Sequence, residues 1–118
     1  ALVSSLTTAV DPRITRAAFL LGGIDFARIV WTSSLVTAQR DEMRRSGLTE
    51  ARLRERLADV EPENYLRPRP GLESLVVAGR FDTVVVPEAT EKLARALGDP
   101  ARLTIDTGHY GGIFVQRK

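Results

Sequence analysis

Two carboxylates and one imidazole in this sequence follow short apolar segments, and such groups are suited to moving protons. Asp25 ends the stretch GGID, Asp82 ends GRFD, and His109, the only histidine, lies in TGHYGG. A carboxylate beside a histidine accepts the Nδ1–H bond, fixes the tautomer and stabilises the imidazolium form. Histidine side chains, with an ordinary pKa of about 6.5, serve well as general bases near neutral pH. These residue types indicate acid–base chemistry if the fold brings them together.

The segments before the three polar residues are typical of strands in a parallel sheet. Apolar runs at 16–23 and 74–79 predict strands buried on both faces, and 101–106 predicts a third strand. Helical patterns separate the strands, so we expect parallel pairing through crossover connections. Ligands bind at the carboxyl ends of such strands. We therefore expect the polar residues to meet at that edge of the sheet.

Helical patterns account for most of the remaining chain. They cover residues 1–10, 24–45, 48–60 and 87–97. Within 48–60, Glu50 precedes Arg54 by one turn, the order that favours a charge pair. Pro87 suits the first position of a helix, and Gly98 suits a left-handed cap at its end. The predicted fold class is therefore α/β, with about three parallel strands in a single domain.

Each polar residue also has a simpler interpretation. An Asp after a strand often forms a turn by accepting from the backbone two residues on, which is the alternative for Asp82. Asp25 precedes a helix that begins near Phe26, and for this residue we prefer a role as helix cap. The alternative for His109 is a structural role in a glycine-rich loop that turns the chain.

Two stretches, LVVAGRFDTVVVPEAT and ARLTIDTGHYGG, resemble the C-terminal part of an α/β-hydrolase. In that family the acid follows the penultimate core strand in a pattern like G-x-x-D, and the histidine follows the last strand in a pattern like G-H. Asp82 and His109 match these positions, in the family's order. Residues 1–25 resemble the helix and strand after the nucleophile turn, and residues 31–70 resemble the helical insertion that often forms a lid. The resemblance implies that 1–118 is the C-terminal part of one hydrolase domain.

The resemblance also implies an activity, namely cleavage of a small-molecule carboxylic ester through a serine acyl-enzyme. His109 is then the base and later the acid, and Asp82 orients it. Tyr110 and Gly111 are expected to border the substrate pocket. Trp31 is a further candidate for an apolar pocket wall, although core packing is the interpretation we prefer for this residue. The family chemistry requires no cofactor, and one histidine without any cysteine makes a metal site unexpected.

The nucleophile of the family is missing from this sequence. It sits in G-x-S-x-G, and no such pentapeptide occurs here; Ser4 and Ser5 lack flanking glycines. We expect the nucleophile upstream of Ala1, with the oxyanion-hole segment and the first five core strands. The half sheet would then expose an edge. Its expected partner is the missing N-terminal half or a second copy, and the alternative function is a non-catalytic association module.

Composition excludes several other classes. The chain carries 17 basic and 15 acidic residues, a net charge of +2, and these alternate through 40–57 as on a solvated helix face. We therefore expect no nucleic-acid binding, which requires concentrated basic charge. No apolar run approaches the ~20 residues that span a bilayer, and no signal peptide is visible, so we predict a cytoplasmic location without a membrane span.

Overall fold

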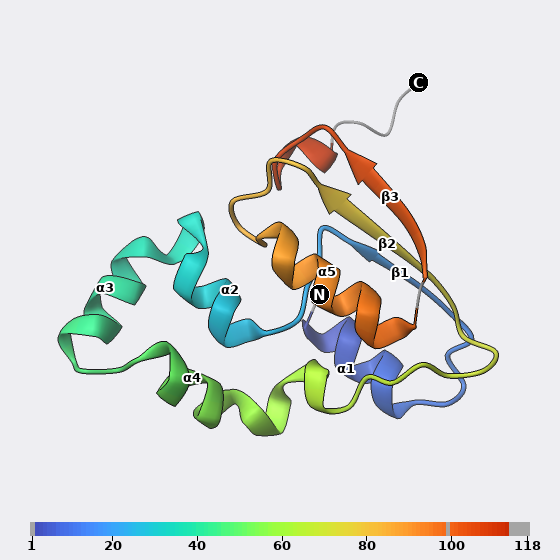
Figure 1. The fold of residues 1–118 in the computed structure, drawn as a ribbon, viewed down its shortest axis with the longest axis horizontal. Helices are drawn as coiled ribbons and strands as arrows, with labels where there is room; N and C mark the ends of the chain where they lie inside the picture. The colour runs from blue at the N-terminus through green and yellow to red at the C-terminus, as the bar shows by residue number, and fades with distance from the viewer. Residues whose placement is uncertain (1, 99, 114–118) are drawn as a thin grey trace.

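The computed structural model describes residues 2–98 and 100–113 of the chain, which form a mixed α/β fold (Figure 1). Within these residues five α-helices and three strands follow one another. They are α1 (Leu2–Val10), β1 (Arg16–Leu20), α2 (Phe26–Thr32), α3 (Thr37–Arg45), α4 (Glu50–Leu57), β2 (Glu73–Gly79), α5 (Pro87–Leu97) and β3 (Ala101–Ile105). Short 3-10 turns are η1 (Ser34–Val36), η2 (Ala58–Val60), η3 (Pro62–Asn64) and η4 (Gly111–Ile113).

The three strands form one parallel sheet in the order β1-β2-β3. Phe19 of β1 pairs with Val76, and Val77 of β2 pairs with Leu103. The carboxyl ends of the strands lie at one edge of the sheet (Figure 1). The α/β class and the three parallel strands predicted from the sequence are confirmed.

The hydrophobic core lies between the sheet and helix α5. It consists of buried side chains from β1, the following turn, β2, α5 and the connector after η3. These are Phe19, Ile24, Leu66, Val76, Leu93, Ala94 and Leu97. Leu93 is fully buried, which stabilises the fold by about 2 kcal/mol. Helix α5 begins with Pro87 and ends at Gly98, whose φ of 77° is left-handed, as predicted.

The expectation that the strands are buried on both faces is wrong for β1, where only Phe19 is buried. It holds at the centre of β2, where Val76 and Val77 point to opposite faces and are 2% and 7% exposed. Ala9 of α1 and the residues of α5 pack on the same side of the sheet, against Phe19 and Val76. On the other side Leu20 is 58% exposed and Leu103 is 51% exposed. Within the described residues, helices therefore cover one face of the sheet, and the other keeps exposed apolar side chains.

Two predicted elements are shorter than expected for local reasons. Strand β1 ends at Leu20 because Leu21 has a positive φ of 51°, which turns the chain away from the extended conformation. The helix predicted at 24–45 is divided at Ser33, which is extended with φ −61° and ψ 133°. The Ser33 hydroxyl accepts from Leu35 N at 3.2 Å, a local bond that competes with helix continuation.

Residues 31–70 form the helical arm that extends from the sheet and carries α3 and α4 (Figure 1). Helix α4 packs against α2. In the described part of the chain, no helix has the length and apolar character needed to cross a membrane.

Candidate functional site

Asp82 and His109 form a hydrogen-bonded pair at the carboxyl edge of the sheet. His109 Nδ1 lies 2.8 Å from Asp82 Oδ2. The Asp82 side chain is 2% exposed and the His109 side chain is 26% exposed. The carboxylate is therefore held inside the protein, while the imidazole reaches the surface.

The second carboxylate oxygen of Asp82 accepts hydrogen bonds from the backbone of the turn that follows. Oδ1 accepts the backbone N–H groups of Val84 and Val85, each at 2.9 Å. The turn-forming alternative for Asp82 is thus correct, and it coexists with the contact to His109 because the two roles use different oxygens. With both oxygens engaged, the carboxylate has a fixed direction relative to the imidazole.

Asp82 and His109, called the dyad below, meet because backbone hydrogen bonding between β2 and β3 continues past the ends of both strands. Arg80 N donates to Ile105 O at 2.9 Å, and Phe81 N donates to Thr107 O at 3.2 Å. Gly79 permits this approach, since a Cβ there would lie 2.9 Å from Thr107 O. The two strand exits are thereby held side by side, and the residues that follow them meet.

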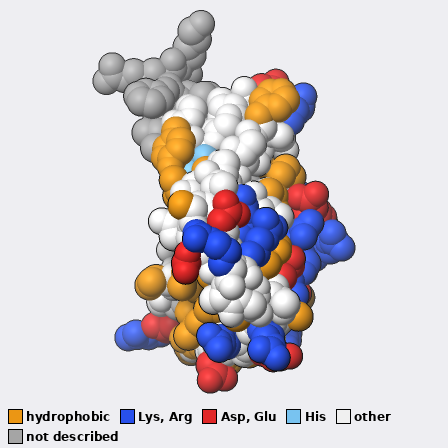
Figure 2. All heavy atoms as spheres, turned by 90° about the vertical axis from the view of Figure 1, so that its left-hand side faces the viewer, with side chains coloured by type: hydrophobic (Ala, Val, Ile, Leu, Met, Phe, Trp, Pro, Cys, Tyr) orange, Lys and Arg blue, Asp and Glu red, His pale blue; other side chains and the backbone are white. Residues whose placement is uncertain are grey.

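The far side of the His109 ring is accessible. No described residue is hydrogen-bonded to Nε2, and Figure 2 shows the histidine at the surface beside hydrophobic side chains. The Tyr110 ring stands edge-on to His109, with centroids 5.5 Å apart, and is 57% exposed. Phe81 is 64% exposed. When Nδ1 donates to Asp82, Nε2 carries the lone pair of the neutral ring and can accept a proton.

The other predicted pocket residues lie in different surroundings. A Cβ on Gly111 would meet Thr107 Cβ at 3.0 Å, so this glycine packs closely against the exit of β3. Trp31 lies on α2 with the Arg44 guanidinium 5.3 Å from its ring centroid. No described ring contact or hydrogen bond links Trp31 to His109, so its role in a pocket stays a prediction.

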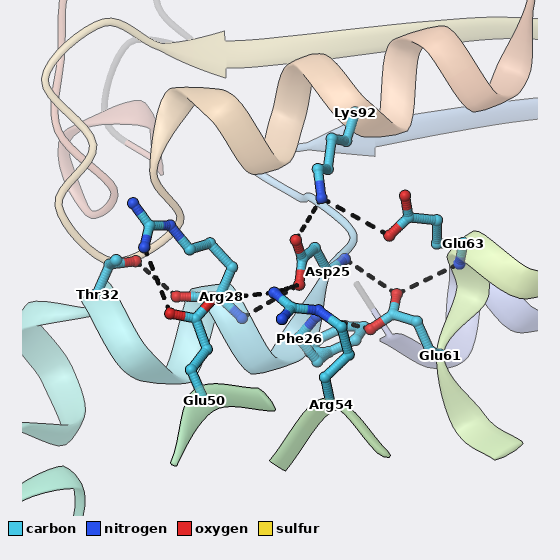
Figure 3. Close-up of polar contacts among 9 residues, drawn as sticks. All are labelled: Asp25, Phe26, Arg28, Thr32, Glu50, Arg54, Glu61, Glu63 and Lys92. Atoms are coloured by element: carbon cyan, nitrogen blue, oxygen red, sulfur yellow. Dashed lines mark hydrogen bonds and ion pairs between the residues drawn. The ribbon is translucent and has the colours of Figure 1, made fainter. Parts of the chain in front are cut away.

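Asp25 does not join the dyad; its carboxylate is the centre of a separate ionic cluster (Figure 3). It caps α2 by accepting from Arg28 N at 3.2 Å, which confirms the preferred interpretation. Arg54 Nη2 of α4 lies 3.0 Å from Oδ1, and Lys92 Nζ of α5 is bonded to Oδ2. The Asp25 backbone has a positive φ of 68°, a strained conformation that the cluster maintains.

The charge on Asp25 is stabilised by its cationic neighbours. Burial disfavours the ionised carboxylate, but the hydrogen bonds from Lys92, Arg54 and the Arg28 amide outweigh it and lower the pKa of Asp25 below its usual value. Asp25 therefore serves as a structural charge that joins α4 and α5 to the turn after β1.

Glu61 completes this cluster from the connector after α4. Its carboxylate accepts Asp25 N at 2.9 Å and Phe26 N at 2.7 Å (Figure 3). Sequence reasoning missed Glu61, because it lies in a proline-rich connector and no local pattern marks its partners. The Glu50–Arg54 pair was predicted from its spacing, and it is present at 2.9 Å.

No family model matches this chain, and no curated protein matches it at a significant level. Within residues 2–98 and 100–113, no group of three or more His, Asp or Glu side chains is arranged to hold a metal ion.

Proposed function

We propose that residues 1–118 form the C-terminal part of a serine hydrolase of the α/β-hydrolase kind, which cleaves carboxylic esters through an acyl-enzyme. The observation that carries this proposal is the 2.8 Å contact between His109 Nδ1 and Asp82 Oδ2, placed after adjacent parallel strands. An oriented imidazole whose second nitrogen is bonded to no described residue is the general base that such chemistry requires.

The proposed reaction uses the two sides of the His109 ring in turn. As a serine hydroxyl attacks the ester carbonyl, its proton moves to Nε2, and Asp82 stabilises the imidazolium through Nδ1–H. The imidazolium then gives this proton to the departing alkoxide. A water molecule repeats the sequence: it loses a proton to Nε2 as it attacks the acyl-enzyme, and the serine leaves by regaining that proton.

The surroundings of the dyad favour an apolar ester. Phe81 and Tyr110 flank Asp82 and His109 in the chain and are 64% and 57% exposed. Aromatic side chains beside a reacting group provide apolar contact area for an alkyl or aryl substituent.

We propose that the serine comes from a segment outside these residues, on a strand that pairs with the free edge of β1. Strand β1 is terminal in the described sheet, and both Ala18 and Leu20 on it are exposed. No described serine is hydrogen-bonded to His109, and the sequence contains no G-x-S-x-G.

A fluorophosphonate probe, which reacts with activated serines, tests this proposal on the natural polypeptide that contains residues 1–118. We expect one labelled serine outside these residues, and loss of labelling in the His109→Ala variant. An absence of labelling would contradict the proposal, as would labelling that is indifferent to His109→Ala.

A second candidate function is a non-catalytic association module. It is favoured by the exposed apolar side chains of Leu20 and Leu103 on the uncovered face of the sheet. A module of this kind would form a stable complex while hydrolysing no nitrophenyl ester. The hydrolase would lose its ester turnover in the His109→Ala variant.

A further inference from the structure

Two hydrogen bonds tie the helical arm to the loop that carries Asp82. Ser34 N donates to Thr83 O at 2.8 Å, and the Ser34 and Thr83 hydroxyl oxygens lie 2.9 Å apart. Ser34 begins η1 within the 31–70 segment, whereas Thr83 directly follows Asp82. The arm therefore touches the candidate site through its backbone as well as through a side chain.

The Ser34 end of this contact is fixed by helix α3. Arg40 Nη1 donates to Trp31 O at 3.2 Å and to Ser33 O at 3.1 Å. The Thr37 hydroxyl donates to Ser34 O at 3.2 Å. These bonds attach the turn between α2 and η1 to helix α3. A movement of α3 is therefore expected to move Ser34 with it.

The Thr83 end of the contact leads directly to the dyad. Thr83 C=O and Val84 N–H belong to one peptide unit, which is planar and therefore moves as one body. Its oxygen accepts from Ser34 N at 2.8 Å, and its N–H donates to Asp82 Oδ1 at 2.9 Å. A single peptide unit thus connects Ser34 to the carboxylate whose other oxygen faces His109. Hydrogen bonds linked in such a chain also polarise one another.

We propose that Ser34 is a positioning residue for the Asp82–His109 dyad, and that the 31–70 segment controls the orientation of the dyad through the Thr83–Val84 peptide. The catalytic meaning of this coupling rests on the proposed function. In the hydrolase, a displacement of the arm during substrate entry loosens the Asp82 carboxylate. Its return restores the His109 tautomer that leaves Nε2 free to accept a proton.

The substitution Ser34→Pro removes the N–H and the hydroxyl that contact Thr83, and proline fits the local backbone angles. Its Cδ takes the place of the amide hydrogen and displaces Thr83 O, so the backbone bond is broken outright. Ser33 already has φ −61° and ψ 133°, the conformation favoured before proline, and Ser34 is the first residue of η1. Ser34→Ala removes the hydroxyl alone and keeps the N–H. The pair therefore separates the backbone bond from the side-chain bond.

The readout is the tautomer of His109, measured from the 15N shifts of its two ring nitrogens. The single histidine makes these signals unambiguous. The ratio is read at alkaline pH, where the two 15N shifts no longer change with pH. We expect Ser34→Pro to lower the ratio of Nδ1–H to Nε2–H about fivefold, the factor that corresponds to one ordinary hydrogen bond. For Ser34→Ala we expect about a twofold decrease.

Two controls decide between the outcomes. Thr32→Val removes a hydroxyl bond of the same kind to Arg28 O at the end of α2, and it should leave the ratio unchanged. Asp82→Asn should lower the ratio by the largest amount, because the amide no longer requires a donor from Nδ1. Circular dichroism establishes that each variant is folded, and Ser34→Ala alone decides the matter if Ser34→Pro is unfolded.

Wild-type ratios in both folded Ser34 variants would overturn the inference, whatever Asp82→Asn does. An unchanged ratio in Asp82→Asn would overturn the dyad contact and the inference together. If the Ser34 variants lowered the tautomer ratio as expected but no serine was labelled by the fluorophosphonate, the proposed function would be overturned and this inference would stand.

Discussion

Asp82 and His109 are 27 positions apart in the sequence, and their side chains meet at 2.8 Å. They meet because β2 and β3 are adjacent and parallel, with Gly79 of β2 paired to Ile105 of β3. Each residue lies a few positions beyond its strand, so the sheet brings both to one edge. The contact is thus a consequence of strand order and strand direction.

Loss of the Asp82 carboxylate is expected to abolish most of the proposed activity. In the natural polypeptide, Asp82→Asn should lower kcat for a short-chain nitrophenyl ester by about 10⁴-fold, because the imidazole loses its tautomer and its stabilised charge. Asp106→Asn is the matched control, since this exposed Asp forms a surface pair with Arg80 at 3.1 Å and should change kcat less than about twofold. An Asp82→Asn variant that kept a large part of the activity would contradict the assigned role.

The free edge of β1 is expected to mediate association. Ala18→Lys places a charge at an exposed position of this edge strand, and lysines on edge strands oppose pairing with another strand. Sedimentation velocity over a range of concentrations should show dimers or larger species for the wild-type chain and monomers for the variant. The control is Thr104→Lys, an exposed position on the opposite edge strand β3, which should associate like the wild type. If both variants showed the same distribution of monomers and larger species, the association would not depend on the edge of β1.

The Asp25 cluster is expected to make stability depend on pH in the acid range. Because the pKa of Asp25 is lowered in the folded chain, its contribution is present above the unfolded value of 3.8 and is lost as the pH falls through the folded value. Asp25→Asn keeps a side chain that tolerates the positive φ and can still cap α2. It should lower the free energy of unfolding by about 2 kcal/mol at pH 7.

Urea denaturation at a series of pH values measures this difference. The gap between wild type and Asp25→Asn should be constant from neutral pH to about pH 5 and should shrink below the unfolded pKa. Asp59→Asn, at an exposed position on η2, should leave the curve unchanged at every pH. A gap that persisted unchanged at the acid end would argue against an ionised Asp25.

Gly23 is expected to tolerate no side chain, because helix α5 lies directly against it. A Cβ at this position would lie 2.8 Å from the backbone carbon of Ala89 and 2.9 Å from its Cβ. Gly23→Ala should destabilise the chain by about 3 kcal/mol through overpacking. Gly47→Ala meets nothing within 4 Å and has a φ of +80°, so it should cost about 1 kcal/mol from backbone strain alone. Thermal unfolding compares the two, and equal losses would refute the close approach.

Local signals in the sequence were enough to predict the class of the fold and the ends of α5, although they missed the break at Ser33 between α2 and α3. Pro87 and Gly98 mark the ends of α5, and the spacing of Glu50 and Arg54 predicted their pair. Such features depend on residues one or two helical turns apart, whose geometry the backbone sets. The meeting of Asp82 and His109 was expected for a related reason, since parallel strands share one carboxyl edge.

Only the tertiary structure decided which distant residues hydrogen-bond to one another and which face of the sheet the helices cover. Lys92 reaches Asp25 across 67 positions, and Ser34 reaches Thr83 across 49. The exposed face of the sheet likewise depends on where the helices pack. Periodicity in a sequence records which side of an element is apolar, and it carries no information about which remote side chain will lie opposite. That choice is made by packing, when strand order and the Gly23–Ala89 contact bring the elements together.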